Sequence, residues 1–242
     1  MRNTRLKRIL LTWNFVIRAL AHRWRRTIFE WLGSDRYSFV ALNELDRKLA
    51  KHLDFRGGTF IEAGANDGIT QSNTYWFERF RGWRGLLIEA VPRKSAECRR
   101  NRPNAIVVNS ALVASDDITS ITMKTANLMA YVVGSFTKSE DEATHLANAE
   151  RVQALSSVTE VSVPASRLST LLDAQNMPQI DLFSLDVEGY EAEVLKGLDL
   201  TRHKPRFILV ETKDIAGVLN VLKQQYTILD QLSFHDYLLK AE

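Results

Sequence analysis

Short apolar runs alternate with stretches of helical periodicity along most of this chain. The apolar runs lie within residues 59–68, 84–92, 104–114, 179–189 and 206–212. Within them the apolar residues are consecutive and do not alternate with polar ones, which is typical of parallel strands that helices cover on both faces. The pattern therefore predicts an α/β fold built on a mostly parallel sheet.

Two regions depart from this pattern. Residues 118–125 and 158–165 alternate between apolar and polar side chains, as antiparallel strands do. The stretch between them, 126–158, has weak periodicity, and we interpret it as an insertion with some helix. It is either a lid that faces the substrate or an elaboration of the surface. Two further strands are expected at 226–231 and 234–240.

The beginning of the chain differs in composition from the rest. Residues 36–53 have the period of a single helix, which the Gly57-Gly58 pair ends. We expect three parts: a basic amphipathic arm (1–32), a helical lead-in (33–56) and an α/β domain (57–242).

The arm carries most of the positive charge. Residues 1–29 contain eight Lys and Arg and no acid, so the remainder sums to −5 within a net charge of +3. Apolar side chains recur there every three or four positions, at Leu6, Ile9, Leu10, Trp13, Ile17, Leu20, Trp24 and Ile28. A basic helix with tryptophans on its apolar side is suited to an anionic membrane surface.

Other interpretations of the arm stay open. A secretory signal fits poorly, because Arg18 interrupts the apolar run and no small-residue cleavage site follows. An organelle transit peptide is a second alternative, and packing of the stripe on residues 36–53 or on a partner chain is a third. The single cysteine, Cys98, excludes an internal disulfide and fits a reducing cytosol. No apolar run reaches the roughly 18 residues of a membrane span. We expect a cytoplasmic protein, either free or peripheral on the inner membrane face.

A glycine-containing turn follows the first apolar run. It consists of Gly64, Ala65, Asn66, Asp67 and Gly68, and Glu62 precedes it. The glycines permit a tight turn and close approach of a ligand. An NAD site would instead show three glycines in GxGxxG spacing and hold a pyrophosphate. An acid beside the turn repels a pyrophosphate and attracts an ammonium group, so we predict S-adenosylmethionine as the cofactor, bound by this turn and Glu62.

Two more positions complete the predicted cofactor site. Glu89 ends the second apolar run, 21 residues after Gly68, where a carboxylate can accept hydrogen bonds from both ribose hydroxyls. Ser110 follows the third run and is predicted to lie near the adenine.

Carboxylates also follow the later runs. Asp186 ends the run within 179–189, with Glu188 immediately after it, and Glu211 ends the next run. One carboxylate can take the proton of an attacking hydroxyl, and another can position that hydroxyl or hold a metal. We predict all three residues to be catalytic. A divalent metal stays an open alternative, because the sequence identifies no complete set of ligands.

Several segments together resemble the FkbM-type methyltransferases. They are FIEAGANDGITQSNT (60–74), LLIEAVP (86–92), NSALVAS (109–115) and IDLFSLDVEGYEAEVLKG (180–197). The resemblance implies a Rossmann-like fold that uses S-adenosylmethionine, with a seven-stranded, mostly parallel sheet whose last strand is antiparallel and whose faces both carry helices. It also implies O-methylation of a hydroxyl on a sugar, glycan or natural product. By this resemblance, Glu62, Gly64 and Glu89 bind the cofactor, and Asp186 and Glu188 belong to the active site.

Two other functions compete with this one. An RNA or protein methyltransferase on the same fold would use the basic stretch of Arg79, Arg81, Arg84, Arg93, Arg99, Arg100 and Arg102. We interpret that stretch as solvated and expect no nucleic-acid partner, because the aromatic residues nearby have the spacing of core residues. A non-catalytic module that binds the cofactor or a partner is the other alternative, and it would not need Asp186 and Glu188. His145 is a further candidate base. The sequence does not indicate the oligomeric state.

Overall fold

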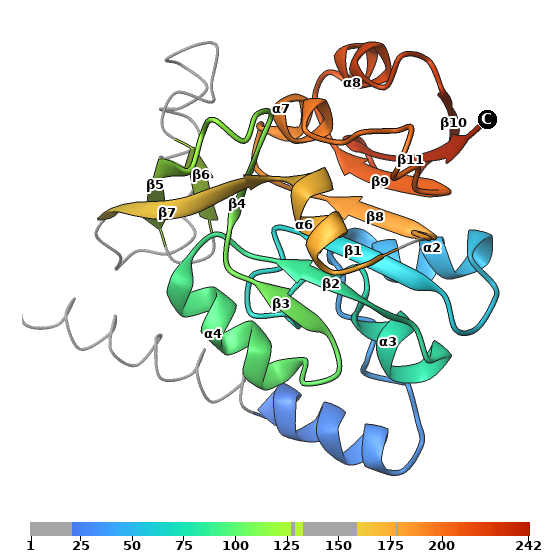
Figure 1. The fold of residues 1–242 in the computed structure, drawn as a ribbon. Helices are drawn as coiled ribbons and strands as arrows, with labels where there is room; N and C mark the ends of the chain where they lie inside the picture. Colours follow the sequence, from blue (N-terminus) through green and yellow to red (C-terminus); the bar gives the residue numbers. More distant parts are fainter. Residues whose placement is uncertain (1–20, 127–128, 133–158, 178) are drawn as a thin grey trace, which may run out of the picture.

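The computed structural model describes residues 21–126, 129–132, 159–177 and 179–242. Its centre is a seven-stranded sheet with the order β10-β11-β9-β8-β1-β2-β3 (Figure 1). The strands are β1 (Thr59–Ala63), β2 (Arg84–Ile88), β3 (Ile106–Val108), β8 (Leu182–Leu185), β9 (Phe207–Glu211), β10 (Tyr226–Gln231) and β11 (Asp236–Ala241). β11 is antiparallel to both of its neighbours, and the other pairings are parallel. The predicted sheet with its reversed last strand is thereby confirmed.

Helices cover both faces of this sheet, as predicted (Figure 1). They are α2 (Leu45–His52), α3 (Tyr75–Arg81), α4 (Pro92–Asn101), α6 (Leu168–Ala174), α7 (Glu191–Lys196) and α8 (Ile215–Val221). Alternate residues of each strand point to opposite faces, so Phe60 packs with α2, α3 and α4 while Ile61 packs with α6, α7 and α8. Two apolar cores result, one on each face, which is why the strands are apolar runs.

The order of the strands reverses beside β1. From β1 the chain runs through β2 and β3 towards one edge, and it returns to pair β8 with the other side of β1. Ligands of such sheets bind at the carboxyl ends of the strands near this switch point. The backbone N–H of Gly64 and the N–H of Ala65 both donate to the carbonyl of Ile88, so the turn after β1 is tied to the end of β2.

A second sheet lies beside the first, with the order β4-β7-β5-β6. It contains β4 (Ala111–Val113), β5 (Ser120–Ala126), β6 (Met129–Val132) and β7 (Thr159–Arg167). The antiparallel pairing of β5 with β7 confirms the two predicted alternating strands. Of the predicted insertion, residues 129–132 form β6, while 133–158, with His145, lie outside the described residues.

The prediction of one strand over 104–114 is wrong. β3 ends at Val108, and the chain crosses to the second sheet before β4 begins at Ala111. The cause lies at Asn109, whose side-chain N–H groups donate to the carbonyls of Glu89 and Ala90 at 2.8 and 2.7 Å. This side chain holds the chain at the end of β2 and turns it out of the first sheet.

The predicted helix over 36–53 is also shorter than expected. α2 begins at Leu45, after the 3₁₀ turn η1 (Leu42–Glu44). The carboxylate of Asp46 accepts the backbone N–H groups of Val40 and Ala41 at 2.7 and 3.0 Å. These two residues therefore fold back over the start of the helix and do not extend it. A separate helix spans 21–31 and contributes the described part of the arm.

Candidate active site

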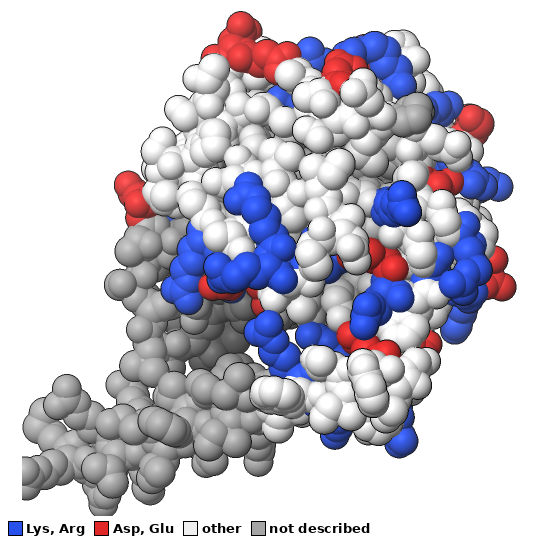
Figure 2. All heavy atoms as spheres, turned by 60° about the horizontal axis from the view of Figure 1, so that its bottom comes forward, with Lys and Arg blue, Asp and Glu red and all other residues white. Residues whose placement is uncertain are grey.

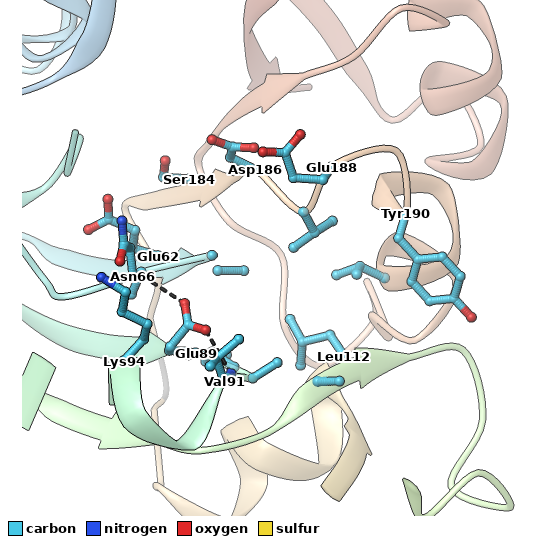
Figure 3. A pocket seen from close by; sticks show the side chains of 18 of the residues that line it. Glu62, Asn66, Glu89, Val91, Lys94, Leu112, Ser184, Asp186, Glu188 and Tyr190 are labelled. Carbon is cyan, nitrogen blue, oxygen red and sulfur yellow. Dashed lines mark hydrogen bonds between the residues drawn. The ribbon is translucent and has the colours of Figure 1, made fainter. Parts of the chain in front are cut away.

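A large pocket opens at the carboxyl ends of β1, β2 and β8 (Figure 3). It encloses about 1080 Å³ of empty space, part of which is open to solvent. The predicted site residues that line it are Glu62, Gly64, Ala65, Asn66, Glu89, Ser110, Asp186 and Glu188. Asp67, Gly68 and Glu211 do not line it. We call this space the larger cavity.

The turn after β1 requires its glycines. Gly64 has a φ of +82°, and a Cβ there would lie 1.9 Å from the carbonyl oxygen of Asp186. Asp67 stabilises the turn from outside the cavity, since its Oδ1 accepts the backbone N–H groups of Ile69 and Thr70 at 2.9 and 2.7 Å. Asn66 lines the cavity, and its buried Oδ1 has no hydrogen-bond partner among the described residues. That oxygen is available to a donor on a ligand.

Glu62 is buried and already has several partners. Its carboxylate accepts hydrogen bonds from Ser72 Oγ (2.8 Å), the Asn73 N–H (2.8 Å) and Thr74 Oγ1 (2.5 Å). These contacts fix the segment before α3 against the end of β1. Glu62 therefore shapes the cavity wall, and its predicted contact with the cofactor's ammonium group stays a prediction.

Arg102 supports the same segment from beneath, which the sequence analysis missed. The sequence predicts a solvated basic stretch here, but the side chain of Arg102 is 1% exposed and pairs with Glu78 at 2.7 Å. It also donates to the Gly68 carbonyl and to Ser72 Oγ and Thr74 Oγ1. Its place at the end of α4, directly before Pro103, was the one available signal, because a residue that ends a helix can turn inward.

Glu89 lies at the end of β2 and points into the larger cavity (Figure 3). Its two oxygens accept the backbone N–H groups of Asn66 and Val91, each at 2.7 Å. Burial raises the pKa of Glu89 to about 7, against the lowering effect of these N–H groups and of Lys94. Ser110 also lines the cavity, but its hydroxyl donates to the Ala111 carbonyl at 2.8 Å.

Asp186 and Glu188 follow β8 and lie close together on the opposite side of the cavity (Figure 3). Glu188 has the left-handed φ of +55°. Burial, followed by the negative charge of Asp186, raises the pKa of Glu188 to about 8. Burial and then the carboxylate of Glu211 hold the pKa of Asp186 well above its ordinary value. Both side chains therefore bind a proton more tightly than an ordinary carboxylate does.

A smaller cavity of about 370 Å³ of empty space adjoins Asp186. Gln71, Asn73 and Asp186 line both cavities, so they stand at the boundary between them. The smaller cavity is lined by Leu42, Leu45, Gln71, Asn73, Leu185, Asp186, Leu209, Glu211 and Asp236. Glu211 is thus separated from the larger cavity, yet it contributes to the raised pKa of Asp186. Burial and then Asp236 raise the pKa of Glu211 itself to about 7.

One group of side chains beside the smaller cavity has the composition of a metal site. His235 Nε2 lies 3.2 Å from Glu211 Oε1 and 3.8 Å from Asp236 Oδ2. One ligand atom from each of the three residues lies within 4.8 Å of the others. Carboxylate oxygens and an imidazole are donors that a divalent cation accepts. Of these three residues the sequence indicates only Glu211, because His235 and Asp236 lie at the start of the distant β11 and meet Glu211 only through the pairing of β11 with β9.

This strand order, with a ligand cavity at the switch point and buried carboxylates at its border, defines a Rossmann-like methyltransferase. The family assignment is more specific. Residues 62–238 match the sequence profile of the methyltransferase FkbM domain, so the chain belongs to the FkbM methyltransferase family. Membership implies S-adenosylmethionine as the methyl donor. No curated protein sequence matches the chain.

Solved structures of other methyltransferases are distantly similar. A methyltransferase FkbM from Methylobacillus flagellatus KT has 13% identity and a TM-score of 0.46, over 77% of this chain and 44% of that one. This chain therefore spans less than half the length of that protein. A TehB-like SAM-dependent methyltransferase from Corynebacterium glutamicum has 12% identity and a TM-score of 0.43, over 92% and 95% of the two chains. A precorrin-6y C5,15-methyltransferase from Geobacter metallireducens has 13% identity and a TM-score of 0.44, over 87% and 96%. Similarity this low does not indicate a substrate.

Proposed function

We propose that this protein methylates a hydroxyl group on a sugar, glycan or natural product, with S-adenosylmethionine as the methyl donor. The observation that carries the proposal is the position of Asp186, a half-buried carboxylate that lines both the larger and the smaller cavity. A donor in one cavity and an acceptor in the other would then meet beside a base.

The lining of the larger cavity fits this cofactor. Among the described residues that border it, Lys94 supplies the one positive charge, against Glu62, Glu89, Asp186 and Glu188. A cationic ligand would stabilise the ionised form of these carboxylates, whereas a pyrophosphate would oppose their ionisation. The unpartnered Asn66 Oδ1 offers an acceptor to an amino or hydroxyl group. Glu89 would accept the ribose hydroxyls, and the turn over 64–68 would pack against the rest of the molecule.

Asp186 at the boundary and Glu188 beside it suit proton removal. In the reaction an O–C bond forms, the bond from the methyl carbon to sulfur breaks, and the hydroxyl proton goes to a carboxylate of the chain. A base works best when its pKa is near the working pH, and the pKa of Glu188 is raised to about 8. Asp186, at the boundary of the cavities, would hold the acceptor hydroxyl or take its proton.

The proposal is tested with labelled S-adenosylmethionine and three fractions of acceptor from one cell extract: glycans and small molecules, protein, and RNA. We expect label in the first fraction, with loss of transfer in Asp186→Asn. Label confined to protein or RNA would contradict the proposed acceptor class. Binding of S-adenosylmethionine with no transfer to any fraction would favour the non-catalytic alternative. Elemental analysis of the purified wild-type protein and of the His235→Gln variant decides whether the Glu211–His235–Asp236 group holds a metal.

A further inference from the structure

The helix over residues 21–31 is attached to the domain by its polar side chains. Glu30 accepts hydrogen bonds from Ser38 Oγ at 2.8 Å and from Tyr75 Oη at 2.9 Å. It also pairs with Arg26 at 3.5 Å and with Arg79 at 3.4 Å, and its side chain is 6% exposed. The inward face of this helix therefore holds the domain through hydrogen bonds and ion pairs.

The outward face of the same helix is apolar. Trp24, Ile28, Trp31 and Leu32 are 68%, 51%, 83% and 63% exposed, respectively. Their spacing of four, three and one places them on one side of a helix. An amphipathic helix normally buries its apolar side against its own domain, and this one does the reverse. Trp24 and Ile28, which belong to the predicted stripe, keep half or more of their surface exposed and are therefore not buried on residues 36–53.

Positive charge surrounds this apolar face. Arg23 and Arg25 are exposed on the helix itself, and Arg23 donates to Asn101 at the end of α4 at 3.1 Å. That contact brings the exposed Arg99 and Arg100 of α4 close to the helix. Figure 2, which brings the bottom of Figure 1 forward, shows groups of Lys and Arg side chains on this side of the molecule, among uncharged residues and fewer Asp and Glu. Residues 1–29 contain no acid at all.

We propose that this face, the apolar side of residues 21–32 with its basic border, docks the protein on an anionic lipid bilayer. Tryptophan side chains are stable at the level of the headgroups, and Lys and Arg meet the lipid phosphates. A second copy of the chain is the poorer occupant, because two such faces would bring like charges together. None of the helices in the described residues has the length and hydrophobicity to cross a membrane. Such docking does not depend on methyl transfer.

The test is co-sedimentation of the full chain with vesicles of phosphatidylcholine alone or mixed with phosphatidylglycerol. We expect binding to the mixed vesicles that weakens as salt is added. Trp24→Ala combined with Trp31→Ala should weaken binding about tenfold or more, because the variant loses two indole groups that the bilayer would bury. Phe234→Ala, which removes an equally exposed aromatic side chain (81%) from the turn between β10 and β11, should leave binding unchanged.

Three outcomes would overturn the proposal. They are equal sedimentation with and without anionic lipid, equal binding by the double tryptophan variant, and a dimer in solution that this variant converts to monomer. The last would assign the face to a second copy of the chain. Both tryptophans are exposed, so the variant should keep the wild-type thermal unfolding curve, which confirms that it is folded.

Discussion

The two sides of the candidate active site hold their carboxylates in different ways. On the β1–β2 side, Glu62 accepts three hydrogen bonds from the chain and Glu89 accepts two. On the β8–β9 side, Asp186, Glu188 and Glu211 lie close enough that each raises the pKa of another.

This difference suits the β1–β2 side to binding the cofactor and the β8–β9 side to proton transfer. Donors that surround a carboxylate fix its position, so the β1–β2 side is arranged before a ligand arrives. Carboxylates that face one another are costly when all are charged, so the β8–β9 side holds protons near neutral pH. A cationic cofactor between the two sides would relieve this repulsion and lower the pKa of Asp186 and of Glu188. Cofactor binding would thereby prepare the base.

The largest expected effect is on the framework of the β1–β2 side. Arg102→Met removes a buried guanidinium from Glu78 and from the loop that Glu62 holds. Glu78, whose side chain is 11% exposed, would lose its partner, and the free energy of unfolding should fall by about 3–5 kcal/mol, measured by denaturant titration. The matched control is Arg100→Met, an exposed change that should cost less than about 0.5 kcal/mol. Equal losses would show that Arg102 is solvated after all.

The next effect concerns the β8–β9 side. Asp186→Asn and Glu188→Gln keep the size of each side chain and remove its ability to take a proton. We expect the methyl-transfer rate to fall about a hundredfold or more in the variant that loses the base. S-adenosylmethionine affinity, measured by calorimetry, should change much less than the rate does. Near-wild-type rates in both variants would contradict the assignment and leave the two residues with a structural role.

Glu89 tests the β1–β2 side as a binding surface. Glu89→Ala removes the predicted partner of the ribose hydroxyls and leaves the N–H groups of Asn66 and Val91 without their acceptor. The cofactor should bind about 2 kcal/mol more weakly in calorimetry. The rate at saturating cofactor should fall far less than in Asp186→Asn. Unchanged affinity would contradict the cofactor role of Glu89.

The sequence predicts those parts of the fold that depend on local pattern. Continuous apolar runs identified the parallel strands, since a strand buried on both faces cannot alternate. The exchange of sheets after β3 was not predictable, because it depends on Asn109 reaching the carbonyls of Glu89 and Ala90. The start of α2 was missed for a similar reason, namely the backbone contacts of Asp46.

The site follows the same rule. The carboxyl ends of parallel strands meet at one edge, so Glu62, Glu89 and Asp186 could be brought together from their positions alone. The sequence does not predict the side chains that reach the site from other helices and strands. Arg102 reaches the Gly68 carbonyl from α4, and Asp236 reaches the smaller cavity through the pairing of β11 with β9. For Arg102 the one local signal is its place directly before Pro103, and for Asp236 nothing local in the sequence distinguishes it from a solvated charge.

The smallest effect is a pH dependence of stability that belongs to the β8–β9 side. The pKa of Glu188 is raised to about 8 in the folded chain, so between its ordinary value of 4.5 and about 8 the folded state binds more protons than the unfolded state. Stability contributed by this group is therefore lost as pH rises through that window. Glu188→Gln removes this loss. Relative to wild type, the variant should gain about 1 kcal/mol or more in unfolding free energy between about pH 5 and pH 8, measured by denaturant titration.

The exposed Glu160→Gln serves as the control and should follow wild type at every pH. Saturating S-adenosylmethionine should reduce the difference between Glu188→Gln and wild type, because the positive charge of the cofactor stabilises the ionised carboxylate. If instead the variant lost stability relative to wild type as pH rose, Glu188 would be ionised and paired in the fold, and the contrast between the two sides of the site would fail at that residue.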